Sequence, residues 1–224
     1  SIAIVSFDQP TQQLAIESEV IIQQYLENPL DFLVADYAVG YPFSYQQEDL
    51  ALLAPYMAGA EGEAAAQLKH WIGSIWQPGE SIQTYSLLQR LNTSIHQGMT
   101  YQLREEPGVQ AATDTLARGT GSCRDFAMLL MAAARQLGLA ARFVTGYLHA
   151  PLSPAAGATH AWAEIYLPGA GWKGFDPTTG TIVGADHIPV AVARLPESVP
   201  PVAGSFRGAA SAKLEVGVWV SKCD

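Results

Sequence analysis

The sequence is poor in cysteine, and this shortage removes several kinds of protein from consideration. Two cysteines occur among 224 residues, Cys123 and Cys223, and neither lies in a CxxC or HExxH pattern. Two cysteines cannot form a disulfide framework and supply too few thiolates for a structural zinc site. The sequence also contains no Asp-rich loop with calcium-ligand spacing. We expect a protein that needs no metal or cofactor. Because reduced thiols are typical of a reducing compartment, we also expect a cytoplasmic location.

Basic residues and long apolar runs are equally scarce. The chain has 12 lysines and arginines against 21 acidic residues, a formal net charge of −9, and no cluster of basic side chains. A nucleic-acid partner is not expected, because binding to phosphates requires positive patches. No apolar run approaches the roughly 20 residues that cross a bilayer, so no membrane partner is expected either.

Hydrophobic residues make up 49% of the chain, which is ample for a buried core. The chain begins without methionine in SIAIVSF, and LAIESEVII at 14–22 alternates apolar with polar residues, so both segments are predicted strands, with a helix as the alternative for 14–22. We expect them to continue a part of the protein that precedes residue 1. From 29 to 55 the sequence is aromatic and interrupted by glycine and proline, which predicts an extended connection.

Helices are predicted in the middle of the chain and strands after them. Apolar residues recur at helical spacing in 61–76, 81–99 and 122–137. Short segments rich in aromatic and β-branched residues follow at 141–150, 159–167 and 171–180, and KLEVGVWVS at 213–221 shows the most regular alternation. This order is typical of an α+β fold with an antiparallel sheet.

The segment GTGSCRDFAMLLMAAARQLG places a thiol at the start of the third predicted helix. Ser122 is a natural N-cap, and Asp125 three residues later completes a capping box. Cys123 then lies in the first helical turn, where the helix dipole favours an anion, and Arg124 adds a positive charge. Without a partner base, however, a lone cysteine is more often a packing residue. The glycines before it either let a ligand approach the backbone or form an ordinary turn.

Three of the five histidines have simple structural interpretations, and a fourth is undecided. His70 and His96 lie in predicted helices, where a surface or packing role is expected, and His149 next to Pro151 is expected in a loop. His187, in GADHIPV, is left undecided between a turn and a residue that supports a site.

His160 differs because its strand brings it near a carboxylate. In THAWAEIYL the alternation places His160, Trp162, Glu164 and Tyr166 on one face of the strand. The next strand ends at Asp176 before Pro177, and the short connection between the two strands makes them antiparallel neighbours. We expect Asp176 to accept the Nδ1 proton of His160, which leaves Nε2 facing the thiol.

Together, three segments resemble the transglutaminase-like superfamily of cysteine enzymes: GTGSCRDFAMLLMAAARQLGLAARFVTGY, THAWAEIYLPGAGW and FDPTTG, within 119–180. The resemblance implies Cys123 as nucleophile, His160 as general base and acid, and Asp176 as the group that orients the histidine. It also implies a papain-like, transglutaminase-like core at 28–224, in which the helix carrying the nucleophile packs on an antiparallel sheet. Residues 1–27 resemble the C-terminal strands of the β-domain that precedes this core in bacterial relatives.

The function implied is thiol acyl transfer on the amide bonds of a peptide or protein substrate. We expect a peptidase or amidase, because the chain lacks the additional domains of animal transglutaminases; a protein transamidase and a catalytically silent peptide-binding module are the alternatives. The backbone N–H of Cys123, at a helix start, is a candidate oxyanion donor. Trp162 and Tyr147 are candidate substrate-binding residues, and the alternative for Trp162 is a core aromatic residue.

Overall fold

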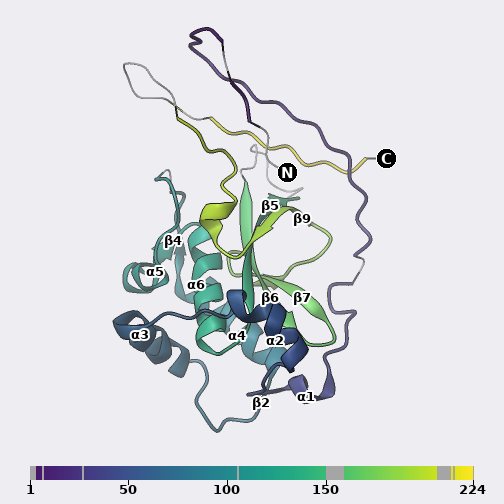
Figure 1. Cartoon of the computed structure of the whole chain (residues 1–224), viewed down its shortest axis with the longest axis vertical. Coiled ribbons are helices and arrows are strands. Elements are labelled where there is room, and N and C mark those ends of the chain that lie inside the picture. Colours follow the sequence, from purple (N-terminus) through teal and green to yellow (C-terminus); the bar gives the residue numbers. More distant parts are fainter. Residues whose placement is uncertain are drawn as a thin grey trace.

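A five-stranded antiparallel sheet forms the centre of the molecule, in the order β8–β7–β6–β5–β9 (Figure 1). The structure is a computed structural model that describes residues 4–6, 8–26, 28–104, 106–149, 159–205, 213 and 215–223. The strands of the sheet are β5 (Ala141–Leu148), β6 (His160–Leu167), β7 (Gly171–Asp176), β8 (Thr181–Ile182) and β9 (His187–Ala193). The predicted α+β class with an antiparallel sheet is therefore confirmed.

Helices cover one face of this sheet, and the three predicted helices are among them. The larger helices are α3 (Gly62–Gly73), α4 (Thr84–Gly98), α5 (Ala112–Arg118) and α6 (Cys123–Gln136). Helix α6 packs on β5 and β6, and α4 on β7 and β8, while α3 and α5 pack against α6. Among the described residues, no helix combines the length and apolar character needed to cross a membrane.

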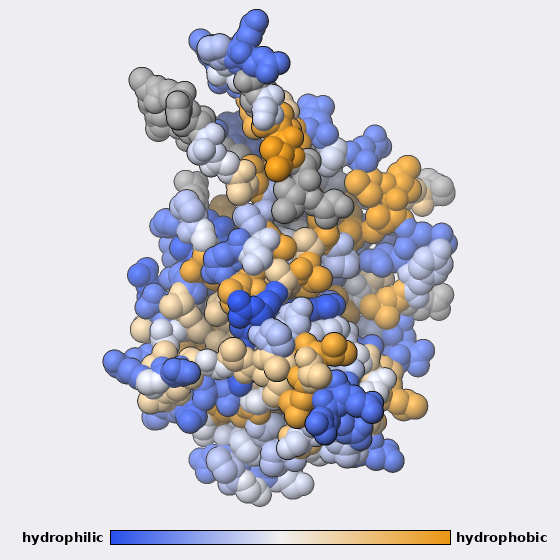
Figure 2. All heavy atoms as spheres, viewed as in Figure 1, coloured by the Kyte–Doolittle hydropathy of each residue, from blue (hydrophilic) through white to orange (hydrophobic). Residues whose placement is uncertain are grey.

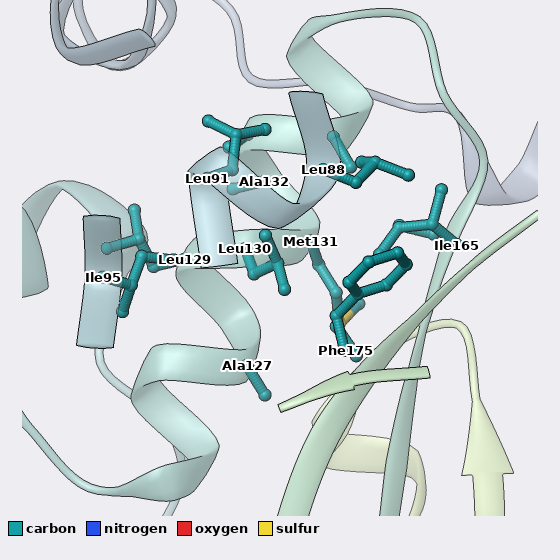
Figure 3. Packing of buried hydrophobic residues seen from close by; sticks show 14 of the residues in the cluster. Leu88, Leu91, Ile95, Ala127, Leu129, Leu130, Met131, Ala132, Ile165 and Phe175 are labelled. Carbon is teal, nitrogen blue, oxygen red and sulfur yellow. The ribbon is translucent and has the colours of Figure 1, made fainter. Parts of the chain in front are cut away.

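The core lies between α4, α6 and the sheet, and Figure 3 shows how some of its side chains pack. Leu88, Leu91 and Ile95 of α4 are fully buried, and each contributes on the order of 2 kcal/mol through burial. Opposite them, the small side chains of Ala161 and Ala163 on β6 belong to the same cluster. The predicted alternation along 159–167 is thus confirmed: Ala161, Ala163, Ile165 and Leu167 belong to this cluster, whereas His160, Trp162, Glu164 and Tyr166 lie outside it.

The segment 29–55 is not the extended connection that its glycine and proline predict. It contains α1 (Asp36–Val39), strand β1 (Gly40–Tyr41, paired with β2, Ile82–Gln83) and α2 (Gln47–Leu53), followed by a 3₁₀ turn at Ala54–Tyr56. Aromatic contacts stabilise this segment on the sheet: Tyr45 packs on Tyr166 and donates its hydroxyl to the Tyr166 carbonyl at 2.9 Å. These tertiary contacts override the local breaker signals.

Two of the predicted strands near the chain ends do not form. Residues 14–22 have neither helix nor strand and are exposed, and in 213–221 the described residues contain only an isolated bridge at Val218. The strand predicted at 1–7 lies partly outside the described residues, and residues 4–6 form no strand. Alternating hydrophobicity forms a strand only where a neighbouring strand supplies hydrogen bonds and covers one face. In Figure 2 apolar side chains are accordingly exposed in the upper part of the view, where these terminal segments run.

Candidate active site

The start of α6 positions Cys123, and a buried carboxylate fixes that start. Ser122 is the N-cap in extended conformation and forms the predicted capping box with Asp125. The Asp125 carboxylate accepts hydrogen bonds from the Ser122 N–H and hydroxyl, both at 2.8 Å. Because Asp125 has no exposed surface, these bonds hold the first turn of the helix rigidly, and with it the half-buried Cys123.

Arg104 completes the set of hydrogen bonds around the Asp125 carboxylate, and its role was not identified from the sequence. Its Nη1 donates to both oxygens of Asp125, at 2.8 and 3.0 Å, and the Gln110 N–H donates to one of them at 2.8 Å. Burial raises the pKa of Asp125, but the hydrogen bonds from Gln110, Ser122 and Arg104 outweigh it and hold this pKa below its ordinary value. Arg124 is engaged nearby, because its guanidinium donates to the carbonyl of Arg104 at 3.1 Å.

The glycines before the thiol form a tight turn, which is one of their two predicted roles. Gly119 ends α5 in the left-handed conformation, with φ of +64°. A Cβ on Gly121 would lie 2.9 Å from the Cβ of Asp125 and 3.2 Å from the Phe126 ring. Only glycine therefore lets strand β4 (Thr120–Gly121) approach the side chains of Asp125 and Phe126 so closely.

His160 and Asp176 meet as predicted, but through the other ring nitrogen. His160 Nε2 lies 2.8 Å from Asp176 Oδ2, whereas the sequence led us to expect Nδ1. The strand register explains why Nε2, and not Nδ1, faces Asp176. Ala163 lies opposite Phe175, so Asp176 is level with Trp162 and reaches His160 diagonally, toward the far edge of the ring. The nitrogen left for the Cys123 thiol is therefore Nδ1.

The pKa of His160 reflects the two groups on either side of its ring. Burial lowers this pKa, but hydrogen bonding and charge from Asp176 and from Cys123 outweigh burial and raise it to about 10. The pKa of Asp176 is held well below its ordinary value: burial alone would raise it, but the hydrogen bonds it accepts prevail. The site thus favours an imidazolium ring beside an ionised carboxylate at neutral pH.

The Asp176 carboxylate is fully buried and accepts hydrogen bonds at both oxygens. The backbone N–H groups of Thr178 and Thr179 donate to Oδ1 at 2.9 and 3.4 Å, and the Thr179 hydroxyl donates to Oδ2 at 2.9 Å. His187 Nε2 also lies 3.1 Å from Oδ2. His187, undecided from the sequence, is thereby placed in the support of the site.

The same cluster brings together three side chains of the kind that bind metals. Ligand atoms of His160, Asp176 and His187 all lie within 4.8 Å of one another. The Nδ1 of His187 accepts the Gly184 N–H at 3.3 Å, so its Nε2 carries a proton and donates to Asp176. A protonated nitrogen does not bind a metal, and this cluster is therefore arranged as a hydrogen-bonded network.

The remaining sequence candidates have different surroundings. Trp162 packs against the rings of His160 and His187. Its side chain is only 1% exposed and therefore supports the histidines without offering a surface to a substrate. Tyr147 is half-buried on β5, and its role in substrate binding stays a prediction. The other three histidines lie outside the cluster: His70 on the surface of α3, His96 bonded to the Thr178 carbonyl, and His149 bonded to Asp186.

Comparison with known proteins places all three candidate residues in one matched region. A model of the transglutaminase-like superfamily matches residues 77–177. An uncharacterized protein of Mycobacterium leprae is 32% identical over 114 residues, which are 49% of this chain and 40% of that protein. A protein-glutamine gamma-glutamyltransferase of Pseudomonas aeruginosa is 33% identical over 102 residues, 42% of this chain and 15% of the enzyme. The chain thus spans less than half the length of these relatives.

One solved structure shares most of the described architecture. The crystal structure of a "putative cysteine protease" from Cytophaga hutchinsonii superposes with a TM-score of 0.54 and 25% sequence identity. The similarity covers 68% of this chain and 49% of that chain. The fold of this chain is therefore similar to that of the Cytophaga protein.

Proposed function

Residues 77–177 of this chain belong to the transglutaminase-like superfamily, and on this premise we propose that the protein is a thiol acyl-transfer enzyme acting on amide bonds of peptides or proteins. The observation that carries the proposal is the 2.8 Å hydrogen bond between His160 Nε2 and Asp176, which leaves Nδ1 as the ring nitrogen available to Cys123. This bond orients a base toward Cys123, and an oriented base is what a thiol nucleophile requires.

The residues define the proton transfers of the reaction. The Cys123 thiol gives its proton to Nδ1 of His160 and its sulfur attacks the amide carbonyl, while the backbone N–H of Cys123, at the start of α6, stabilises the oxyanion. The Nδ1 of His160 then gives its proton to the leaving amine, and a thioester remains on Cys123. In the second half the same nitrogen accepts a proton from the attacking water or amine, and the acyl group leaves the sulfur. Asp176 stays ionised throughout, because its hydrogen bonds stabilise the charged form.

Peptide or amide hydrolysis is the reaction that we favour, and the structural similarity to the Cytophaga protein supports it. Transamidation is the second candidate, because the Pseudomonas relative is a protein-glutamine gamma-glutamyltransferase. Both reactions use the same thioester and differ in the acceptor that reaches it.

Incubation of the protein with a peptide library, with and without a fluorescent primary amine, separates these reactions by mass spectrometry. New termini or deamidated glutamine indicate hydrolysis, whereas ammonia release with amine adducts indicates transamidation. Cys123→Ala is expected to abolish either product, and Cys223→Ala, which changes an exposed thiol, is the matched control that keeps it. Binding of peptides without any product would overturn the proposal in favour of a silent peptide-binding module.

A further inference from the structure

Two histidines share one oxygen of the buried carboxylate. His160 Nε2 and His187 Nε2 lie 2.8 and 3.1 Å from Asp176 Oδ2, and the Thr179 hydroxyl donates to the same atom. The backbone donors of Thr178 and Thr179 hold the other oxygen. Because four donors would still hold the carboxylate without His187, its position does not depend on His187 alone.

The backbone fixes the protonation of the His187 ring. The Gly184 N–H points at Nδ1 at 3.3 Å and makes this nitrogen an acceptor. A neutral imidazole with an accepting Nδ1 carries its hydrogen on Nε2, which is the nitrogen that faces Asp176. His187 is thus a neutral donor to a charged acceptor.

Packing prevents the His187 ring from turning away. The residue is 6% exposed, and its ring stands edge-on to Trp162 with centroids 5.3 Å apart. Its backbone pairs with Leu148 of β5, and its carbonyl accepts the Gln24 side-chain amide at 2.8 Å. The titratable groups at the ring are Asp176 and His160; Asp186, next in the chain, faces His149 instead.

We propose that His187 is a positioning residue that divides the charge of Asp176 between two donors and thereby limits how tightly His160 holds its proton. This inference rests on the proposed thiol acyl transfer, in which His160 must give a proton to the leaving amine. An imidazolium held too tightly by its carboxylate is a weak acid and slows that step. A second neutral donor on Oδ2 withdraws part of the negative charge and leaves His160 more acidic.

Histidine NMR on the folded protein tests the inference without any activity assay. His187→Phe keeps a ring in the pocket and removes the donor, whereas His187→Gln keeps an amide N–H near the position of Nε2. The pKa of His160 is expected to rise by about half a unit or more in His187→Phe and to change little in His187→Gln. An unchanged or lowered pKa in His187→Phe, or the same rise in both variants, would overturn the inference.

Two further readouts keep the test decisive. In the wild-type spectrum, His187 is expected as the Nε2–H tautomer, and an Nδ1–H tautomer contradicts the inference even where His187→Phe fails to fold. In the peptide assay, kcat is expected to fall about tenfold in His187→Phe with KM unchanged, and His187→Gln is expected to restore it. An inactive wild-type protein would refute the proposed function alone, because the titration of His160 would still report the effect of His187.

Discussion

The buried Asp125 is the residue whose removal should most damage the start of α6. Asp125→Ala deletes the acceptor of the Ser122 and Gln110 hydrogen bonds and leaves the Arg104 guanidinium without its bidentate partner. Breaking a buried ion pair from one side costs about 3–5 kcal/mol, and loss of an N-terminal cap about 1 kcal/mol. Arg104 retains 17% side-chain exposure and has Glu106 at 3.6 Å, which relieves part of the cost. We therefore expect a loss of about 3 kcal/mol in the free energy of unfolding.

Equilibrium unfolding in urea measures this loss, with Asp114→Ala as the matched control. Asp114 is also an acidic residue in a first helical turn, that of α5, but it is exposed, and its removal should cost about 0.5 kcal/mol. The double variant Asp125→Ala with Arg104→Met should recover part of the loss, because no uncompensated charge remains. A loss in Asp125→Ala as small as that in Asp114→Ala would refute the anchoring role of Asp125.

Two further predictions concern the sheet and the histidine pair. Gly146→Ala should lower the free energy of unfolding in urea by about 2 kcal/mol, because the added Cβ would overlap the Ile188 carbonyl on β9. Gly98→Ala is the control and should cause no such loss, because no atom lies within 4 Å of the Cβ it adds. Equal stability of the two variants would contradict the pairing of β5 with β9. The pKa of His160 is raised from an ordinary 6.5 to about 10, so the native state binds the extra proton in this window. Its contribution to stability is complete below pH 6.5 and is lost as the pH rises to about 10, a decline that thermal unfolding should detect in the wild type and find reduced in His160→Gln.

The capping box and the pairing of His160 with Asp176 could be predicted from the sequence because their signals are local. The capping box needs only Ser122 and Asp125 at a fixed spacing, and the alternation of β6 turned His160 away from the alanine face without any tertiary information. The choice of ring nitrogen was wrong because it depends on the register between β6 and β7. A shift of two residues along a strand decides which edge of an imidazole meets the carboxylate, and no pattern in either strand encodes that shift.

Strand β9 was not predicted, and the role of His187 was left undecided, for a related reason. Pro189 argues against a central strand, yet β9 lies at the edge of the sheet and its pairing with β5 shifts register beside Gly146, where proline is tolerated. At the chain ends the error was the reverse, because strands were predicted that do not form. The alternation there is regular, but a strand also requires a neighbouring strand, which the local pattern does not specify. Arg104 gave no signal, because an arginine that pairs with a carboxylate 21 residues away resembles a surface residue in the sequence.

Selective alkylation of Cys123 tests the central claim, that this thiol is the activated nucleophile. At pH 6 an ordinary thiol is almost entirely protonated and reacts slowly with iodoacetamide. Cys223 is exposed and Cys123 is half-buried, so access alone would favour Cys223. If His160 and the start of α6 activate the thiol, Cys123 is labelled first at pH 6, and His160→Gln removes that advantage. Labelling of Cys123 no faster than that of Cys223 would contradict the account.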